Sequence, residues 1–177
     1  ICVHRTLPGV IEHEAYGGVN LGYRAGDVKE AALAEQGASM FTQAGIDCKA
    51  IELEKARWQK LVWNVPYNGL SFVLNSATRG MMGHASTRQL ITDIMHEVVN
   101  AAAANGYALP DGIVEAMLKN TDAMPDYYPS MYHDSVAQRP LELDAIYRTP
   151  LRQAAEAGVS MPKTEMLLQA LEFVARL

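Results

Sequence analysis

From about Glu54 to the C-terminus the sequence keeps a helical period, and no further strand signal appears. The clearest segment begins near Ser86 or Thr87, either of which is a suitable N-cap, and Asn105-Gly106 is a suitable end. Its apolar residues recur every three or four positions and consist of Leu90, Ile91, Ile94, Met95, Val98, Val99 and Ala102. This periodicity predicts that most of the chain is α-helical.

Other boundaries follow from glycine, proline and capping residues. The first helix is expected from about Glu54, past Pro66, to about Leu74 or Asn75, with a break at 80–83 before the long helix. Pro110 suits the start of the next helix. Short helices are expected from about Ser130 and about Leu141, and a last helix follows Met161-Pro162, with inward-facing Met166, Leu167, Leu171 and Val174.

The first 52 residues differ in character and are predicted to be α/β. Gly17-Gly18 lies between two β-like runs, which predicts a hairpin. Asp27 and Glu30 form a capping-box pattern for a helix over 28–44, which Gly45 would end before a strand at 46–51. These pieces are too few for their own core, and the chain starts without Met in an apparent strand. We therefore expect a fragment that lacks its N-terminal part.

Composition narrows the class of protein. The net charge of -5 and the absence of any run of basic residues argue against a nucleic-acid partner. The two cysteines, without Cys-x-x-Cys spacing, indicate a reducing compartment, which we interpret as the cytoplasm, and no metal site. No apolar run approaches the roughly 20 residues of a membrane span, so no membrane association is expected.

The chemistry is expected on the segment 58–68, WQKLVWNVPYN. Lys60, Asn64 and Asn68 follow one another at intervals of four residues, so their polar groups share one helix face. Asparagine is a poor helix former, and Pro66 adds a kink, so a solvated surface gives no reason for this pattern. In the alternative interpretation, Lys60 only extends to solvent and the asparagines bond to nearby backbone.

Several common catalytic motifs are absent. The sequence has no G-x-G-x-x-G loop and no G-x-S-x-G motif, so neither a complete nucleotide site nor a nucleophilic serine is expected. His96-Glu97 has no second histidine four residues on, so we interpret it as a packed or solvated pair.

Three motifs taken together resemble the ketopantoate reductase (2-dehydropantoate 2-reductase) family. They are W-x-K-x-x-x-N-x-x-x-N at 58–68, S-M-x-x-D at 130–134 and E-x-D at 142–144, followed by G-V-S-M-P at 158–162. The resemblance implies that 1–52 is the closing part of an NADP-binding Rossmann domain. It implies that 53–177 is the all-helical substrate and dimerisation domain, of the 6-phosphogluconate dehydrogenase C-terminal-like type.

The resemblance also implies roles for individual residues. Lys60 falls on the catalytic lysine, Asn64 and Asn68 on substrate-binding asparagines, and Ser130 on the serine that binds the substrate carboxylate. Glu142 falls on the active-site glutamate, which we expect to act in catalysis and at the cofactor. The expected protein is a cytoplasmic, homodimeric NADPH-dependent reductase of a small 2-keto acid, 2-dehydropantoate, in pantothenate and coenzyme A biosynthesis.

Three departures from the family pattern leave alternatives open. The glycine-rich cofactor loop is absent, so the isolated chain is expected to be inactive. Arg148 stands where the family often has glycine and is expected to crowd or recharge the pocket, and Pro66 is expected to redirect Asn68. The alternatives are a reductase of another small keto or imino substrate, and a non-catalytic helical dimerisation or binding module of the same fold.

Overall fold

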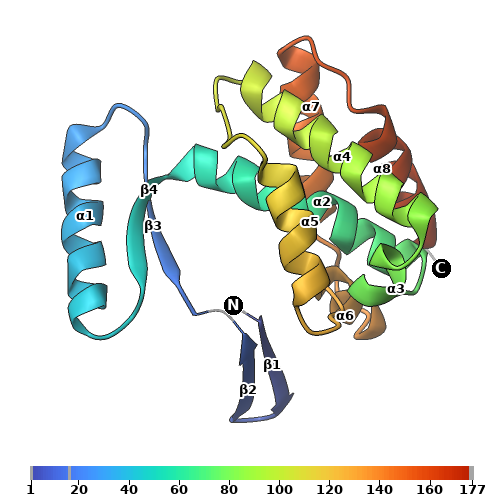
Figure 1. Ribbon diagram of the computed structural model, residues 1–177, viewed down its shortest axis with the longest axis horizontal. Coiled ribbons are helices and arrows are strands. Elements are labelled where there is room, and N and C mark those ends of the chain that lie inside the picture. Colours follow the sequence, from blue (N-terminus) through green and yellow to red (C-terminus); the bar gives the residue numbers. More distant parts are fainter. Residues whose placement is uncertain (1, 16, 176–177) are drawn as a thin grey trace. The chain divides into compact units, whose positions relative to one another are not determined.

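The computed structural model describes residues 2–15 and 17–175, which fall into two compact units, 1–56 and 57–177. Figure 1 labels the helices and strands of both. The first unit is a small α/β assembly, and the second consists of helices. The fold is therefore mainly α with a small α/β part before it, which confirms the predicted fold class.

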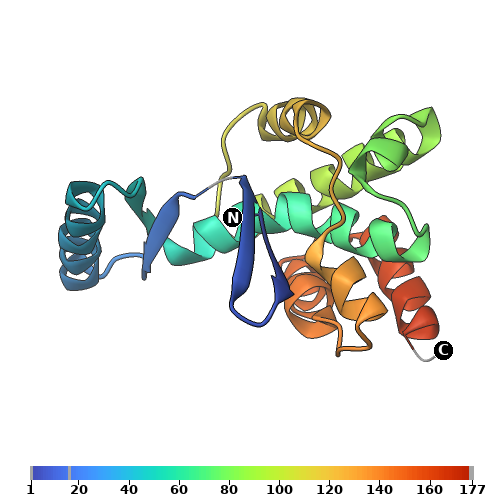
Figure 2. The same cartoon turned by 90° about the horizontal axis from the view of Figure 1, so that it is seen from below.

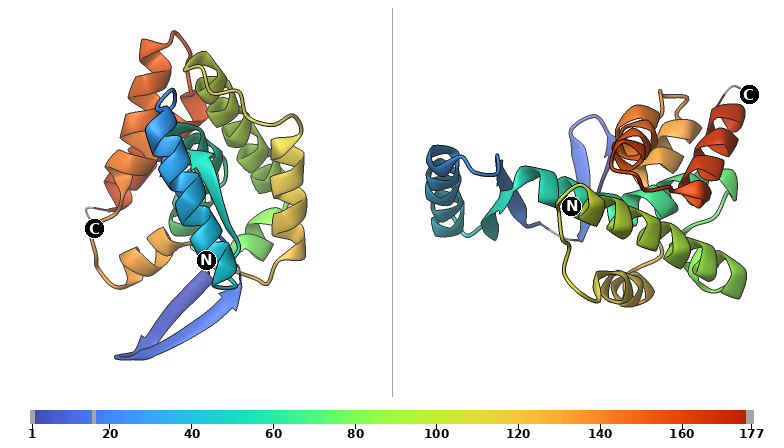
Figure 3. Two further views of the ribbon diagram at one scale, coloured as in Figure 1. Left: turned by 90° about the vertical axis from the view of Figure 1, so that its left-hand side faces the viewer. Right: turned by 90° about the horizontal axis from the view of Figure 1, so that it is seen from above.

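The first unit contains a β-α-β crossover. Its elements are β1 (Cys2–Leu7), β2 (Val10–Ala15), β3 (Val19–Tyr23), α1 (Val28–Gln43) and β4 (Cys48–Glu52). β3 and β4 are parallel neighbours, with Leu21 opposite Ala50, and α1 packs against both strands (Figure 3, left). Parallel strands need such a crossover because a short turn cannot bring the chain back to the starting edge.

The hairpin prediction was wrong in its position. The turn lies at Pro8-Gly9, where β1 and β2 pair antiparallel with Leu7 opposite Val10. Proline presets the φ angle that a turn needs, and Gly9 has φ +80°, which glycine adopts without a side-chain clash. The alternation of apolar and polar residues identified 19–23 as a strand. This alternation does not show which strand pairs with β3, and the partner strand is β4 and not β2.

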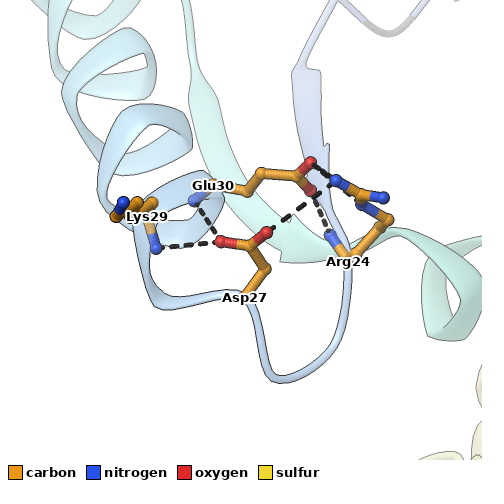
Figure 4. A network of polar contacts seen from close by, with 4 residues as sticks. All are labelled: Arg24, Asp27, Lys29 and Glu30. Atoms are coloured by element: carbon orange, nitrogen blue, oxygen red, sulfur yellow. Dashed lines mark hydrogen bonds and ion pairs between the residues drawn. The ribbon is translucent and has the colours of Figure 1, made fainter.

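The N-terminus of α1 is capped as expected, with one difference (Figure 4). Asp27 Oδ1 accepts the backbone N–H groups of Lys29 and Glu30, both at 3.0 Å. The Glu30 carboxylate does not return to the Asp27 N–H, which donates to the Arg24 carbonyl at 3.2 Å. The Glu30 carboxylate accepts instead from the Arg24 backbone N–H at 3.0 Å and from the Arg24 guanidinium. The helix ends before Gly45, which has φ +82°.

The second unit is organised around its longest helix. Its elements are α2 (Leu53–Val73), α3 (Thr78–Met82), α4 (Ala85–Ala104), α5 (Ile113–Ala123), α6 (Ser130–Val136), the π-helical turn η1 (Asp144–Arg148), α7 (Thr149–Glu156) and α8 (Pro162–Val174). Within this unit α2 runs between α5 on one side and α6 on the other (Figure 2). Val62 and Val65 of α2 and Ile91 and Ile94 of α4 are fully buried, as the α4 stripe predicted.

Three local predictions in this unit were wrong. The segment 80–83 is not a simple break, because α3 continues to Met82. The N-cap of α4 is His84, and Thr87 Oγ1 donates to the His84 carbonyl at 3.0 Å, which an N-cap hydroxyl would not do. Met166 is 58% exposed, and Leu168 takes its place in the core together with Leu167.

The His96-Glu97 pair has a structural role through its glutamate. The Glu97 carboxylate accepts the backbone N–H groups of Lys163 and Thr164, each at 2.9 Å, and the Thr164 hydroxyl at 2.8 Å. It therefore caps the N-terminus of α8 from α4. Among the residues described, no three His, Cys, Asp or Glu side chains are grouped to hold a metal, and no helix could span a membrane.

Candidate active site in the helical unit

Lys60, Asn64 and Asn68 form a polar stripe along α2, and their burial increases in that order. Lys60 is exposed, Asn64 is half-buried and Asn68 is only 2% exposed. A primary carboxamide at that depth needs hydrogen-bond partners, because an unpaired buried amide costs about 1–3 kcal/mol. The environment of Asn68 therefore decides what this end of the stripe can do.

Asn68 joins α2 to the start of α6. Its Oδ1 accepts the backbone N–H of Met131 at 3.1 Å and the hydroxyl of Ser130 at 3.3 Å. A backbone N–H only donates, so the atom facing Met131 must be the amide oxygen, and the Asn68 side-chain orientation is fixed. The Nδ2 hydrogens are then what the amide offers to a ligand oxygen. The structure thus brings together two predicted site residues that lie 62 positions apart in sequence.

Lys60 and Glu142 are both exposed. No ion pair joins the Lys60 ammonium to the Glu142 carboxylate in the described part of the chain. Glu142 precedes η1, and its backbone carbonyl accepts the Ile146 N–H at 3.1 Å. Its position beside a π-helical turn is notable because such turns are frequent at functional sites.

Tyr147 in η1 contacts the α2 backbone between Asn64 and Asn68 and was not predicted as a site residue. Its hydroxyl donates to the Val65 carbonyl at 2.8 Å, and its side chain is fully buried. A β-carbon on Gly69 would lie 2.5 Å from this hydroxyl and 2.9 Å from Leu167. The available sequence signal was Gly69 itself, since a glycine inside a helix next to a polar stripe often marks close packing.

Aromatic residues anchor the flank of α2 that packs against α5 and α3. Trp63 Nε1 donates to Thr121 Oγ1 at 3.0 Å, and its ring stacks on Tyr67 with centroids 4.6 Å apart. The Tyr67 hydroxyl contacts the Met82 sulfur at 2.9 Å. Burial raises the pKa of Tyr67 to about 12, so this hydroxyl stays protonated at neutral pH.

Arg148 does not recharge the candidate site in the way the sequence suggested. Its guanidinium binds Asp144 at 2.7 Å and Glu172 of α8 at 2.6 Å, and these carboxylates raise the Arg148 pKa through hydrogen bonds and charge. The two carboxylates neutralise the positive charge of Arg148. Because Asp144 is in η1 and Glu172 is in α8, the pairs also connect these two elements. Asp134 of the S-M-x-x-D motif is likewise paired with Arg139 at 2.7 Å.

The family described as "Ketopantoate reductase PanE/ApbA C terminal" matches residues 52–175. The chain belongs to this family. The match covers residues 57–175 of the helical unit and the three motifs that carry Lys60, Ser130 and Glu142.

Individual relatives agree with this membership. A 2-dehydropantoate 2-reductase of Nostoc sp. (strain PCC 7120) is 38% identical over 98% of this chain, which spans 56% of that protein. A crystal structure of 2-dehydropantoate 2-reductase from Geobacter metallireducens GS-15 is 42% identical with a TM-score of 0.89, covering 98% of this chain and 58% of that one. The chain therefore spans a little over half the length of these relatives.

More distant structures share the fold. D-mandelate dehydrogenase in complex with NADH and anilino(oxo)acetate has a TM-score of 0.82 at 23% identity, covering 97% of this chain and 56% of that one. At this identity the likeness concerns the fold alone.

Proposed function

We propose that this chain is the C-terminal portion of an NADPH-dependent 2-keto-acid reductase that converts 2-dehydropantoate to pantoate. In this proposal residues 1–52 close a nicotinamide-binding Rossmann domain, and 53–177 bind the substrate and form a homodimer. Support comes from family membership and from relatives named 2-dehydropantoate 2-reductase, of which the chain spans a little over half.

The observation that carries the proposal is the hydrogen-bonded contact between Asn68 and the Ser130-Met131 segment. It places an amide N–H donor and a serine hydroxyl, from two separate motifs, at one point of the helical unit. A hydroxyl and a carboxamide can bind the carboxylate and hydroxyl of a 2-keto acid without adding charge. We assign Ser130 to the substrate carboxylate, toward which its O–H would turn from Asn68 Oδ1, and Asn64 and Asn68 to the remaining oxygens of the substrate.

Lys60 is assigned as the proton donor. Reduction of the keto carbon develops negative charge on the carbonyl oxygen, and an ammonium group beside that oxygen stabilises the charge and supplies the proton. A bound reduced nicotinamide would supply the hydride. Within this chain we assign only Glu142 to the cofactor, as an exposed carboxylate that can accept a hydrogen bond from a ribose hydroxyl.

The direct test is an assay of the full-length gene product. It should oxidise NADPH with 2-dehydropantoate, and faster than it oxidises NADH. A panel of aromatic and aliphatic 2-keto acids and one imino acid tests the alternative of a different substrate. An intact, folded protein that reduces none of these compounds would favour the non-catalytic binding module.

The isolated chain provides a second test, because it lacks a glycine-rich loop. Fluorescence titration of residues 1–177 with NADPH should show no measurable affinity, whereas the full-length protein should bind. Tight binding by the isolated chain would contradict the proposed location of the cofactor site. Sedimentation of the full-length protein tests the proposed homodimer.

A further inference from the structure

Two features change the hydrogen bonding of the α2 backbone around Asn64 and Asn68. Pro66 has no N–H, so the Val62 carbonyl lacks the donor that a regular helix would supply four residues on. The second feature is the Val65 carbonyl, which accepts a further hydrogen bond from the Tyr147 hydroxyl at 2.8 Å. This hydroxyl lies beside Gly69, where an added β-carbon would come within 2.5 Å of it.

A side chain that hydrogen-bonds to a helix carbonyl competes with the helix's own N–H for that oxygen, which can change the local direction or pitch of the helix. The position of the Tyr147 hydroxyl at the Val65 carbonyl is confined by its surroundings. Tyr147 is 0% exposed, and the absence of a side chain on Gly69 leaves room for its oxygen. Leu167 of α8 packs against the same glycine. A buried phenol that bonds to a backbone carbonyl of another helix has little freedom to move, so it fixes the geometry it contacts.

The turn that carries Tyr147 is itself held in place. The neighbouring residue, Arg148, binds Asp144 in the same turn and Glu172 on α8. Glu142 lies two residues before the first residue of this turn. Tyr147 is therefore a direct link between the segment that carries Glu142 and the segment of α2 that carries the two asparagines.

We propose that Tyr147 is a positioning residue of this site, whose hydroxyl sets the local pitch of α2 and thereby the placement of Asn64 relative to Asn68. It does not touch the substrate and acts through α2. The effect on substrate binding, the alignment of two amide groups on one small 2-keto acid, rests on the proposed function. The effect of the Tyr147 hydroxyl on the geometry of α2 is independent of the substrate.

The test compares Tyr147→Phe with Tyr67→Phe in the full-length protein. Tyr67 is a matched control because it is also a fully buried tyrosine with a bonded hydroxyl, but its partner is the Met82 sulfur and not the backbone of α2. Hydrogen exchange of the peptide 64–70 reports on the ladder whether or not any substrate is known. Steady-state kinetics with 2-dehydropantoate and saturating NADPH then report on alignment.

We expect changed exchange in 64–70 for Tyr147→Phe and not for Tyr67→Phe. We also expect KM for the keto acid to rise about tenfold in Tyr147→Phe while kcat changes by less than about threefold, because substrate groups are misaligned and the proton donor is untouched. Unchanged exchange in 64–70 overturns the inference even if the wild type reduces no keto acid. Changed exchange with unchanged KM overturns the positioning role, whereas lack of wild-type turnover counts against the proposed function alone.

Discussion

The carboxylate of Glu97 in α4 accepts the backbone N–H of Thr164 in α8 at 2.9 Å. The same carboxylate binds the Thr164 hydroxyl and the Lys163 N–H, so it satisfies three donors at the start of α8. Thr164 is fully buried and cannot turn to water for a replacement. The C-terminal helix is therefore held by a cap that comes from a helix 66 positions earlier in the chain.

Glu97→Ala should lower the free energy of unfolding by about 2–3 kcal/mol, because buried donors at Thr164 lose their acceptor. Glu165→Ala is the control, since that exposed glutamate in the first turn of α8 contributes only a dipole interaction of about 0.3–1 kcal/mol. Urea unfolding curves measure both changes. Equal losses in the two variants would show that the Glu97 cap adds nothing beyond charge.

Gly69→Ala should destabilise the protein by about 1–3 kcal/mol despite the better helix propensity of alanine. The added β-carbon would lie 2.5 Å from the Tyr147 hydroxyl and 2.9 Å from Leu167, and both groups are buried. Gly80→Ala in α3 is the control, because its β-carbon would meet only the Ser76 hydroxyl, which can rotate away. Thermal melts of the two variants that coincide would argue against close packing at Gly69.

Much of the helical unit was predictable because its signals are local. The stripe of α4, the stop at Asn105-Gly106 and the start of α8 after Met161-Pro162 depend on residues a few positions apart. Some errors arose where a partner is distant in sequence, as for β3, which pairs with β4 across a crossover. Others concerned local features, such as the Pro8-Gly9 turn and the face of α8, where the stripe of Leu167, Leu168 and Leu171 excludes Met166.

The candidate site was predictable to a different extent. Spacing placed Lys60, Asn64 and Asn68 on one face of α2, but the contact of Asn68 with Ser130 and Met131 joins helices distant in sequence. Tyr147 was not found because its hydroxyl reaches the backbone of another helix, and Gly69 indicates close packing at that point without identifying the residue that packs there.

Alkaline pH should destabilise the protein through two buried tyrosines. Burial raises the pKa of Tyr67 to about 12 and raises that of Tyr147 further above its ordinary value of 10.0. Each folded-state pKa exceeds the unfolded one, so this contribution is fully present below pH 10.0 and is lost as pH rises above it. The slope should approach about 1.4 kcal/mol per pH unit for each tyrosine.

Denaturant unfolding at a series of pH values measures this slope. The doubly substituted Tyr67→Phe, Tyr147→Phe protein is the control, because its core no longer carries these phenols. It should start less stable at neutral pH but lose less on going to alkaline pH. If wild type and control share one slope, the loss must come from other groups.

Asn68→Asp in the full-length protein should raise KM for 2-dehydropantoate by about tenfold or more. The new side chain keeps an oxygen for the Met131 N–H but replaces the Nδ2 donor with a second oxygen, which repels an anionic substrate. Asn105→Asp is a matched control at the end of α4, where Nδ2 donates to the Ala101 and Gln153 carbonyls. That variant should lose stability with KM unchanged, and a wild-type KM in Asn68→Asp would remove Asn68 from the substrate site.

Substitution of Lys60 distinguishes a catalytic role of the polar stripe on α2 from a stripe that is only solvated. Its side chain is exposed, so Lys60→Ala should leave the melting temperature nearly unchanged in either case. If Lys60 donates the proton, kcat should fall by about 10² or more, a loss of roughly 3 kcal/mol of transition-state stabilisation. Lys60→Arg should restore little, because a guanidinium is a poor proton donor near neutral pH and has a different shape.

Lys119→Ala is the control, because it removes an exposed lysine from α5 and should keep wild-type turnover. The measurement is kcat with saturating NADPH and 2-dehydropantoate, and near-wild-type kcat in Lys60→Ala would reject the catalytic assignment and favour the binding module.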